Sequence, residues 1–276
     1  MKICILIVIY GKKIEESTSI TTLIDGLSNL SGNYYLRLVN NGPKPLELKL
    51  NIPQGVKIEL INSIQNRPLS SIYNEFIEYY KDFDRYVILD DDTQLNANYI
   101  SRINTEDYFD LELPKIINSD KEIFYPLKNW KVVSSEENIL INSKENIFSI
   151  GSGIILSNNL VNIFLSKGKK VFNESFVFYG VDFSLFFEIN KKNFPMLIIT
   201  SYTQILHDMS LHGEVSKEKK YELYLNYAIQ VRQYPMVLTI KTFLHSIFCL
   251  LQEKDSRSLY SFLKVFWVGK HPKSEI

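Results

Sequence analysis

The sequence has few cysteines, no excess of either charge and no phosphate-binding glycine loop, and each shortage narrows the range of functions. Two cysteines, Cys4 and Cys249, occur in 276 residues. Both lie in apolar stretches, so we expect buried thiols in a reducing cytoplasm and no disulfide framework. Lys and Arg together number 31, as do Asp and Glu, and without a net basic field nucleic acid is not an expected partner. The lack of a P-loop argues against an ATP-driven enzyme.

The N-terminal residues 3–10 form a continuous, largely β-branched apolar run. The run is too short for a signal peptide, and no small-residue cleavage site follows it. We therefore expect it to be the first strand of the fold, buried on both faces as in a parallel sheet that is covered by helices.

Strand-like and helix-like segments alternate over the first hundred residues. Short apolar runs at 34–39, 56–61 and 85–89 each end in polar residues, whereas apolar residues recur every three or four positions in 17–30 and 70–80. This alternation predicts an α/β fold with a mostly parallel, Rossmann-like sheet flanked by helices. In such sheets, ligands bind at the carboxyl ends of the strands.

The pattern is weaker further along the chain. Residues 105–148 show only scattered charge and short strand-like pieces. We then expect a strand interrupted by small residues at 148–156, and another that starts at 196–200 and leads towards His207. Together with the first half, these elements predict one main domain over residues 1–215.

Residues 216–276 are expected to form a helical C-terminal extension. Two apolar stripes there have helical spacing: Leu244, Ile247, Phe248 and Leu251, then Leu259, Phe262, Leu263 and Phe266. Residues 241–276 also contain six Lys or Arg against three Asp or Glu. The stripes are too short and too polar to span a bilayer, so they either pack as ordinary core or lie on a membrane surface.

Three consecutive carboxylates, Asp90, Asp91 and Asp92, directly follow the strand expected at 85–89. Their mutual repulsion favours a bound cation, and hard oxygen ligands suit Mg²⁺ or Mn²⁺. Alternate residues of an extended segment project the same way, so Asp90 and Asp92 are the expected pair and Asp91 should point elsewhere. A bare acidic triplet is more often a solvated turn, and the neighbouring motifs therefore decide between the two.

Several other short motifs follow one another along residues 1–215. They are Val39-Asn40-Asn41-Gly42, Asn66, Asn74, Leu89-Asp90-Asp91-Asp92-Thr93, Gly151-Ser152-Gly153 and Tyr179-Gly180-Val181-Asp182. Their order resembles that of glycosyltransferase family 2, which has the GT-A fold. Within that family, the residues of these motifs are similar to those of the bacterial rhamnosyltransferase-like branch.

The resemblance implies an inverting glycosyltransferase of the hexosyl or deoxyhexosyl type. Its donor would be a nucleotide-diphosphate sugar such as a UDP- or dTDP-sugar, and its acceptor a saccharide or a lipid-linked saccharide. The product would belong to a bacterial surface polysaccharide such as O-antigen or capsule. The cysteine content fits the cytoplasm, with peripheral contact at the inner face of the cell membrane as the alternative that the C-terminal stripes leave open.

Individual residues take roles from the same resemblance. Asp90, Asp92 and His207 would hold Mn²⁺ or Mg²⁺, with His212 as a competing ligand. The residues expected at the nucleotide sugar are Tyr10, Asn41, Asn66, Asp90 and Asp91.

On the acceptor side, Asp182 would be the general base, and Gly151, Ser152 and Gly153 would contact the acceptor. From the residues alone, Asp182 could instead be a helix N-cap, and the glycines could simply relieve packing in a strand.

The chain departs from the family pattern at two positions. Ile9-Tyr10-Gly11 replaces the usual Thr-Tyr-Asn, and Val181 replaces the Glu that usually precedes the catalytic Asp. Two other classes of function stay open. A phosphatase-type hydrolase also uses an Asp-x-Asp pair, but it expects Thr or Val where this chain has Gln94, and it expects the pair after its first strand. A non-catalytic sugar-binding module is favoured only if Asp90, Asp92 and Asp182 do not face one cleft.

Overall fold

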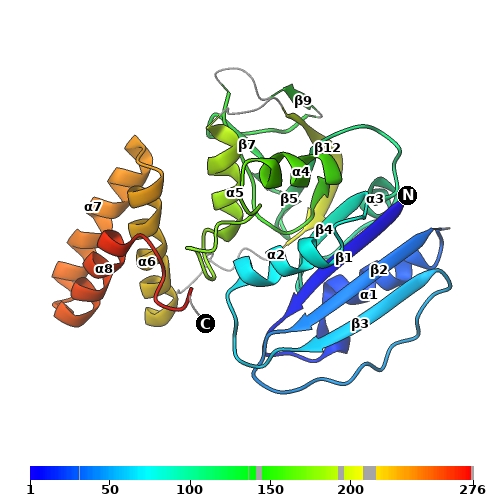
Figure 1. The fold of residues 1–276 in the computed structure, drawn as a ribbon, viewed down its shortest axis with the longest axis horizontal. Coiled ribbons are helices and arrows are strands. Elements are labelled where there is room, and N and C mark those ends of the chain that lie inside the picture. The colour runs from blue at the N-terminus through cyan, green and yellow to red at the C-terminus, as the bar shows by residue number, and fades with distance from the viewer. Residues whose placement is uncertain (31, 136, 141–144, 192–195, 208–215, 275–276) are drawn as a thin grey trace.

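The structure, a computed structural model, describes residues 1–30, 32–135, 137–140, 145–191, 196–207 and 216–274. Its main element is a nine-stranded mixed sheet in the order β3-β2-β1-β4-β11-β5-β12-β9, with β6 pairing to β5 (Figure 1). The strands are β1 (Lys2–Ile9), β2 (Asn33–Asn40), β3 (Val56–Asn62), β4 (Arg85–Asp90), β5 (Leu111–Ile117), β6 (Ile123–Tyr125), β9 (Glu137–Leu140), β11 (Ile154–Ser157) and β12 (Leu197–Leu206).

The first four strands in this order, β3, β2, β1 and β4, are parallel, and the sequence explains why β1 lies inside the sheet. Cys4, Leu6 and Val8 of β1 belong to one buried apolar cluster, whereas the alternate residues Ile5 and Ile7 belong to another. A strand that is apolar on both faces needs a helical layer on each side. The α/β prediction is confirmed, and β4 and β11 make the sheet mixed because they pair antiparallel.

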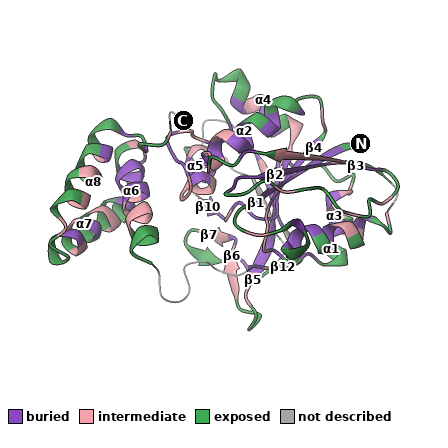
Figure 2. Cartoon of the chain, turned by 90° about the horizontal axis from the view of Figure 1, so that it is seen from below, coloured by how far each residue is buried: buried purple, intermediate pink, exposed green. Residues whose placement is uncertain are grey.

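Helices supply the two covering layers (Figure 2). Their bounds are α1 (Thr18–Leu27), α2 (Leu69–Tyr79), α3 (Ala97–Ile103), α4 (Asn158–Ser166) and α5 (Val181–Asn190), with a short 3₁₀ turn, η1 (Ile14–Glu16). Apolar residues of α1 and α3 join the cluster of Ile5, and those of α2, α4 and α5 join the cluster of Leu6. Ser17 caps α1, since its side chain accepts a hydrogen bond from Ile20 N.

The strand expected at 148–156 proved to be two strands in different sheets. Its first part is β10 (Ile147–Phe148), which joins β7 (Leu127–Lys128) and β8 (Lys131–Val132) in a small second sheet. Its last part is β11 of the main sheet. Between them the chain turns sharply, and Gly153 has a φ of +83° that favours glycine. This turn, residues 149–153, places Ser152 beside the acidic cluster.

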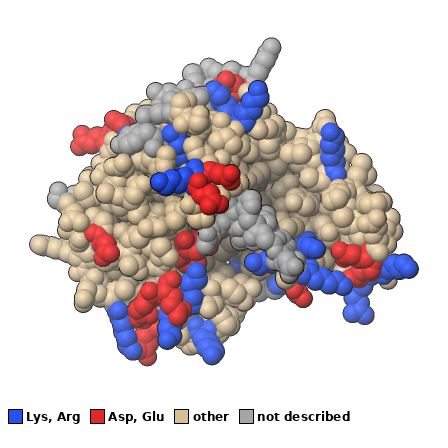
Figure 3. Space-filling view, turned by 180° about the vertical axis from the view of Figure 1, so that it is seen from behind, with Lys and Arg blue, Asp and Glu red and all other residues tan. Residues whose placement is uncertain are grey.

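The C-terminal residues form the expected helices α6 (Lys217–Gln233), α7 (Val237–Gln252) and α8 (Ser256–Val268). They pack against one another at one end of the molecule (Figure 1), with the Phe243 ring 5.0 Å from that of Phe262. None of the described helices has the length and apolarity needed to cross a membrane. The division into domains at 215/216 stays a prediction. On the face shown in Figure 3, acidic and basic side chains lie close together between large uncharged areas.

Candidate active site

The acidic cluster lies at the carboxyl-end edge of the sheet, as the strand pattern predicted. Asp90 ends β4, Asp92 lies in the turn that follows, and His207 comes directly after β12. His207 Nδ1 is 3.3 Å from Asp92 Oδ1, and His207 Nε2 is 3.8 Å from Asp90 Oδ2. One donor atom from each residue falls within 4.8 Å of the other two. The grouping of these three side chains is confirmed, whereas His212 lies outside the described residues.

Two properties of this cluster fit a bound cation. Asp92 Oδ1 is buried and accepts no hydrogen bond, which costs free energy unless another positive partner is present. Burial, followed by repulsion from Asp92 and Asp182, raises the pKa of Asp90 to about 6 despite the attraction of His207. Burial likewise raises the pKa of Asp92. A divalent cation relieves both penalties, and two carboxylates with an imidazole form a donor set that accepts Mn²⁺ or Mg²⁺.

Asp91 points away from the pair, as the alternation predicted. Its Oδ1 forms an ion pair with Lys12 Nζ at 2.8 Å, and its Oδ2 accepts a hydrogen bond from Tyr10 N at 3.2 Å. Tyr10 itself is 52% exposed. Asp91 thus anchors the loop after β1, and its contact with a nucleotide sugar stays a prediction.

Asn41 and Asn66 shape the same edge of the sheet. Asn41 is buried, and its amide donates to Arg67 O at 2.9 Å and accepts from Arg67 N at 2.8 Å. Asn66 N donates to Asn41 O at 3.1 Å. Both ends of the Asn41 amide are therefore engaged by protein. Their predicted contacts with the nucleoside remain predictions, and the observed bonds hold the loop that leads into α2.

Ser152, expected at the acceptor, lies behind the cluster of Asp90, Asp92 and His207, which is called the cation cluster from here on. It is fully buried, and its Oγ accepts a hydrogen bond from Asp90 N at 3.1 Å and lies 2.6 Å from Thr93 Oγ1. Thr93 Oγ1 is in turn 3.0 Å from His207 Nδ1. This hydrogen-bonded chain positions two of the three cation ligands, so the geometry favours a supporting role for Ser152 and leaves the acceptor role a prediction.

Sequence reasoning missed Ser19, which fixes the acidic turn from the other side. Its Oγ donates to Asp90 O and accepts from Thr93 N, the latter at 2.9 Å. A serine in the first turn of a helix is common, and nothing in its spacing marked it out. Lys12, the partner of Asp91, was also missed, because nothing in the sequence pattern marks it out.

Asp182 lies in the first turn of α5, where Gly180 occupies the N-cap position. The N-cap interpretation of Asp182 is therefore wrong by two residues. One carboxylate oxygen accepts from Gly151 N at 3.0 Å and the other from Phe183 N at 2.8 Å, while burial raises the pKa of Asp182 against the lowering effect of these bonds. A carboxylate has about four acceptor positions, so two remain for a ligand.

A cavity of about 470 Å³ connects these parts. Asp90, His207, Gly151 and Asp182 all line it, so two of the three residues of the cation cluster and the predicted base face one cleft. Many of the other lining side chains are aromatic, including Tyr73, Tyr125, Trp130, Tyr179, Phe183 and Tyr227.

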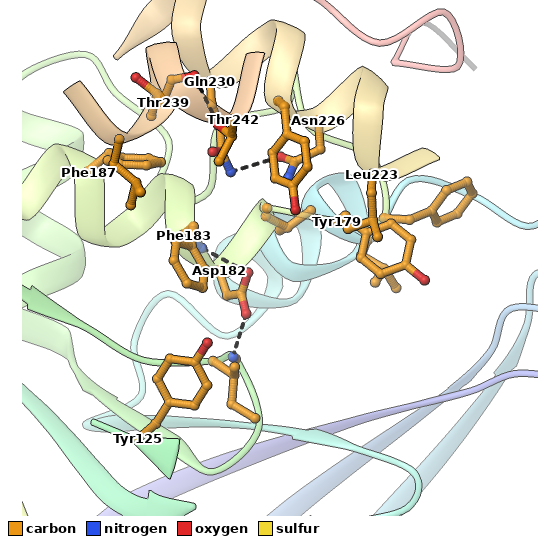
Figure 4. A pocket seen from close by; sticks show the side chains of 18 of the residues that line it. Tyr125, Tyr179, Asp182, Phe183, Phe187, Leu223, Asn226, Gln230, Thr239 and Thr242 are labelled. Atoms are coloured by element: carbon orange, nitrogen blue, oxygen red, sulfur yellow. Dashed lines mark hydrogen bonds between the residues drawn. The ribbon is translucent and has the colours of Figure 1, made fainter. Parts of the chain in front are cut away.

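The far wall of the cavity comes from the C-terminal helices. Asn226 and Gln230 of α6 and Thr239 and Thr242 of α7 form it, and Asp182 lies between this wall and Tyr125 (Figure 4). These residues were missed because helix packing brings them to the site from more than forty positions away in sequence.

The sheet order and the position of the site at its carboxyl-end edge agree with the expected α/β architecture, the GT-A fold. A phosphatase-type fold would have its acidic pair after the first strand, whereas here the pair follows β4. No protein-family model matches the sequence, and no curated protein matches it either.

Solved structures carry the comparison further. The chain is similar to S. aureus TarS residues 1–349, with a TM-score of 0.54 and 11% identity, over 100% of this chain and 82% of that one. It is also similar to the same fragment in complex with UDP, with a TM-score of 0.50 and 13% identity, over 95% and 71% of the two chains. At such identities the likeness concerns the fold, and it confirms the predicted GT-A fold. It gives no support to the rhamnosyltransferase-like branch.

Proposed function

We propose that the protein is an inverting glycosyltransferase that moves a sugar from a nucleotide-diphosphate donor to a saccharide or lipid-linked acceptor. The observation that carries this proposal is that Asp90 and His207 of the cation cluster line the same cavity as Asp182. The fold neighbour whose structure contains UDP supports a UDP-sugar donor, and a dTDP-sugar is the alternative. The order of the motifs along residues 1–215 supports the same assignment.

On the donor side, Asp90, Asp92 and His207 would hold Mn²⁺ or Mg²⁺. The cation would offset the negative charge that develops on the departing nucleoside diphosphate. The chain's own contribution is to keep two of the three ligands, Asp90 and His207, in place through Ser152 and Thr93.

On the acceptor side, Asp182 would accept the proton of an acceptor hydroxyl. The hydroxyl oxygen then bonds to the anomeric carbon of the donor sugar while the bond from that carbon to the diphosphate oxygen breaks. A single displacement of this kind inverts the anomeric centre. Because the backbone N–H groups of Gly151 and Phe183 fix the carboxylate, its free acceptor positions can be directed at the substrate. The aromatic lining suits the apolar faces of sugar rings.

Narrower statements belong to the same proposal. The motif order supports transfer of a hexosyl or deoxyhexosyl unit in surface-polysaccharide synthesis, in the cytoplasm or at the inner face of the membrane. It also supports a catalytic domain at 1–215 with a helical extension at 216–276, although the extension supplies one wall of the cavity.

The test is hydrolysis of a panel of UDP- and dTDP-sugars with Mn²⁺ or Mg²⁺, combined with calorimetric binding of UDP. We expect turnover of one donor that requires the cation. Asp92→Asn should lose both UDP binding in Mn²⁺ and turnover, whereas Asp182→Asn should lose turnover but keep UDP binding. Asp25→Asn, at an exposed position on α1, is the matched control. Full turnover in both site variants would exclude the mechanism.

A further inference from the structure

The C-terminal helices expose an apolar face that no other described element covers. On α7, the residues Leu244, Phe248 and Leu251 recur at helical spacing and are each more than half exposed. On α8, Tyr260 is 70% and Trp267 is 76% exposed. Contiguous apolar surface of this kind usually marks an interaction site.

These exposed side chains are not needed to hold the three helices together. The opposite sides of α7 and α8 carry the buried residues Leu250, Phe262 and Val265, and the aromatic contact between Phe243 and Phe262 joins the two helices. In Figures 1 and 2, α7 and α8 form the end of the molecule that lies away from the sheet, with α6 between them and α5. The exposed stripes are therefore free to meet a partner.

The charges beside the stripes indicate which partner. Neither α7 nor α8 contains an acidic residue, whereas Lys241, Arg257 and Lys264 are all exposed. Of the acids in the turn between the helices, Asp255 caps α8 and pairs with Lys217 at 3.4 Å. A two-fold interface with a second copy would place this cationic patch against itself. An anionic surface complements it.

We infer that the outer face of α7 and α8 binds the surface of an anionic lipid bilayer. Amphipathic helices that lie in a bilayer interface combine Leu, Phe and Trp on one side with Lys and Arg at its edge. Trp267 and Tyr260 are the residue types that favour the headgroup region. The three cations add attraction to anionic headgroups.

One consequence rests on the proposed function. The cavity-lining residues Leu238, Thr239 and Thr242 also belong to α7. A protein that binds lipid through α7 therefore holds its acceptor cavity next to the bilayer surface, where the saccharide of a lipid-linked acceptor lies.

The test is co-sedimentation of the full chain with vesicles of phosphatidylcholine, alone or mixed with phosphatidylglycerol. We expect binding to the mixed vesicles that salt weakens. Leu244→Ser/Phe248→Ser/Trp267→Ser should lower the partition coefficient by about 100-fold or more, whereas Leu165→Ser/Ile52→Ser, at exposed apolar positions elsewhere, should leave it unchanged. Circular dichroism checks that each variant folds.

A charge variant provides an independent measurement. Lys241→Gln/Lys264→Gln should lower partitioning into the mixed vesicles by about fivefold for each lysine, and the exposed pair Lys44→Gln/Lys81→Gln should have less effect. Wild type that stays in the supernatant, or equal binding by the triple variant and its control, would overturn the inference. So would a wild-type dimer in sedimentation velocity that the triple variant abolishes, without any vesicle binding.

The failure of this inference is distinguishable from failure of the proposed function. The substituted residues do not line the cavity, so the triple variant should hydrolyse donor as the wild type does in vesicle-free buffer. If neither protein hydrolyses any donor, the proposed function fails while the vesicle result still stands.

Discussion

Because the carboxylates of the cation cluster are crowded, Asp90→Asn should make the protein more stable than the wild type without metal and less stable than the wild type with metal. Without metal, burial and the neighbouring carboxylates raise the pKa of Asp90 from 3.8 to about 6, so the ionised side chain destabilises the folded state. A shift of this size corresponds to about 3 kcal/mol at most. Because 39% of the Asp90 side chain is exposed, solvent screening reduces the effect to about 1 kcal/mol.

Asp90→Asn removes this charge, so in EDTA at about pH 8 the variant should be more stable than the wild type by about 1 kcal/mol, or roughly 2–4 °C in melting temperature. In saturating Mn²⁺ the wild type should instead be more stable than the variant. A cation at about 100 times its dissociation constant stabilises the wild type by about 2.7 kcal/mol, and the variant, which lacks one ligand, should gain little.

The pH dependence provides a check on the cause. The pKa of Asp90 is higher in the folded protein than in the unfolded chain. The contribution of this side chain to the stability of the wild type is therefore fully present below about pH 4 and is lost as the pH rises through about 6. The advantage of Asp90→Asn in EDTA should therefore disappear towards pH 4. Scanning calorimetry with Asp25→Asn as control measures all three effects. A variant less stable than wild type in EDTA, or one with the same gain from Mn²⁺, would refute the reasoning.

Three further predictions concern the parts around the cluster. Asp182→Asn should lower the turnover rate by about 10²–10⁴-fold. Because burial raises the pKa of Asp182, the activity of the wild type should fall on the acid side at a pH above the ordinary pKa of an aspartate, and a pH–rate profile would record this. Ser152→Ala should cost about 2 kcal/mol, since it removes the side-chain acceptor of Asp90 N and one partner of Thr93 Oγ1, which keeps His207 Nδ1. Urea denaturation measures this, and unchanged stability together with unchanged Mn²⁺ affinity would contradict it. Gly153→Ala should destabilise the protein by at least about 2 kcal/mol in the same assay, because a Cβ there would lie 2.8 Å from Pro114 Cγ and would overlap Ile205. Gly168→Ala, at a similar φ but with open space around it, should cost about 1 kcal/mol, and equal losses would mean that the close contact is unimportant.

The sequence predicted the site best where the residues follow strands directly. Strand alternation separated Asp90 and Asp92 from Asp91, and the family resemblance assigned His207 to the same cation. The structure turns Asp91 towards Lys12 and groups His207 with the other two carboxylates. Such predictions succeed because parallel strands end at a common edge of the sheet.

Features set by turns and tertiary packing were not predictable. The apolar run at 148–156 looked continuous, and only the left-handed backbone at Gly153 divides it between two sheets. Strands of two or three residues within 105–148 are too short to show a period. The α6–α7 wall of the cavity depends on how helices pack, and periodicity shows which face of a helix is apolar but not which partner it meets.

The turn at 149–153 has a consequence for how the proposed enzyme can change its acceptor. Gly151 N donates a hydrogen bond to Asp182, and the side chain of the next residue, Ser152, accepts one from Asp90 N, so two neighbouring residues of one turn contact both the proposed base and a proposed cation ligand. Neither of these two hydrogen bonds involves a residue of α6 or α7. Substitution of Thr242, a cavity residue of α7, can therefore reshape the proposed acceptor cavity while both hydrogen bonds are kept, and the helical wall is the place to redesign specificity.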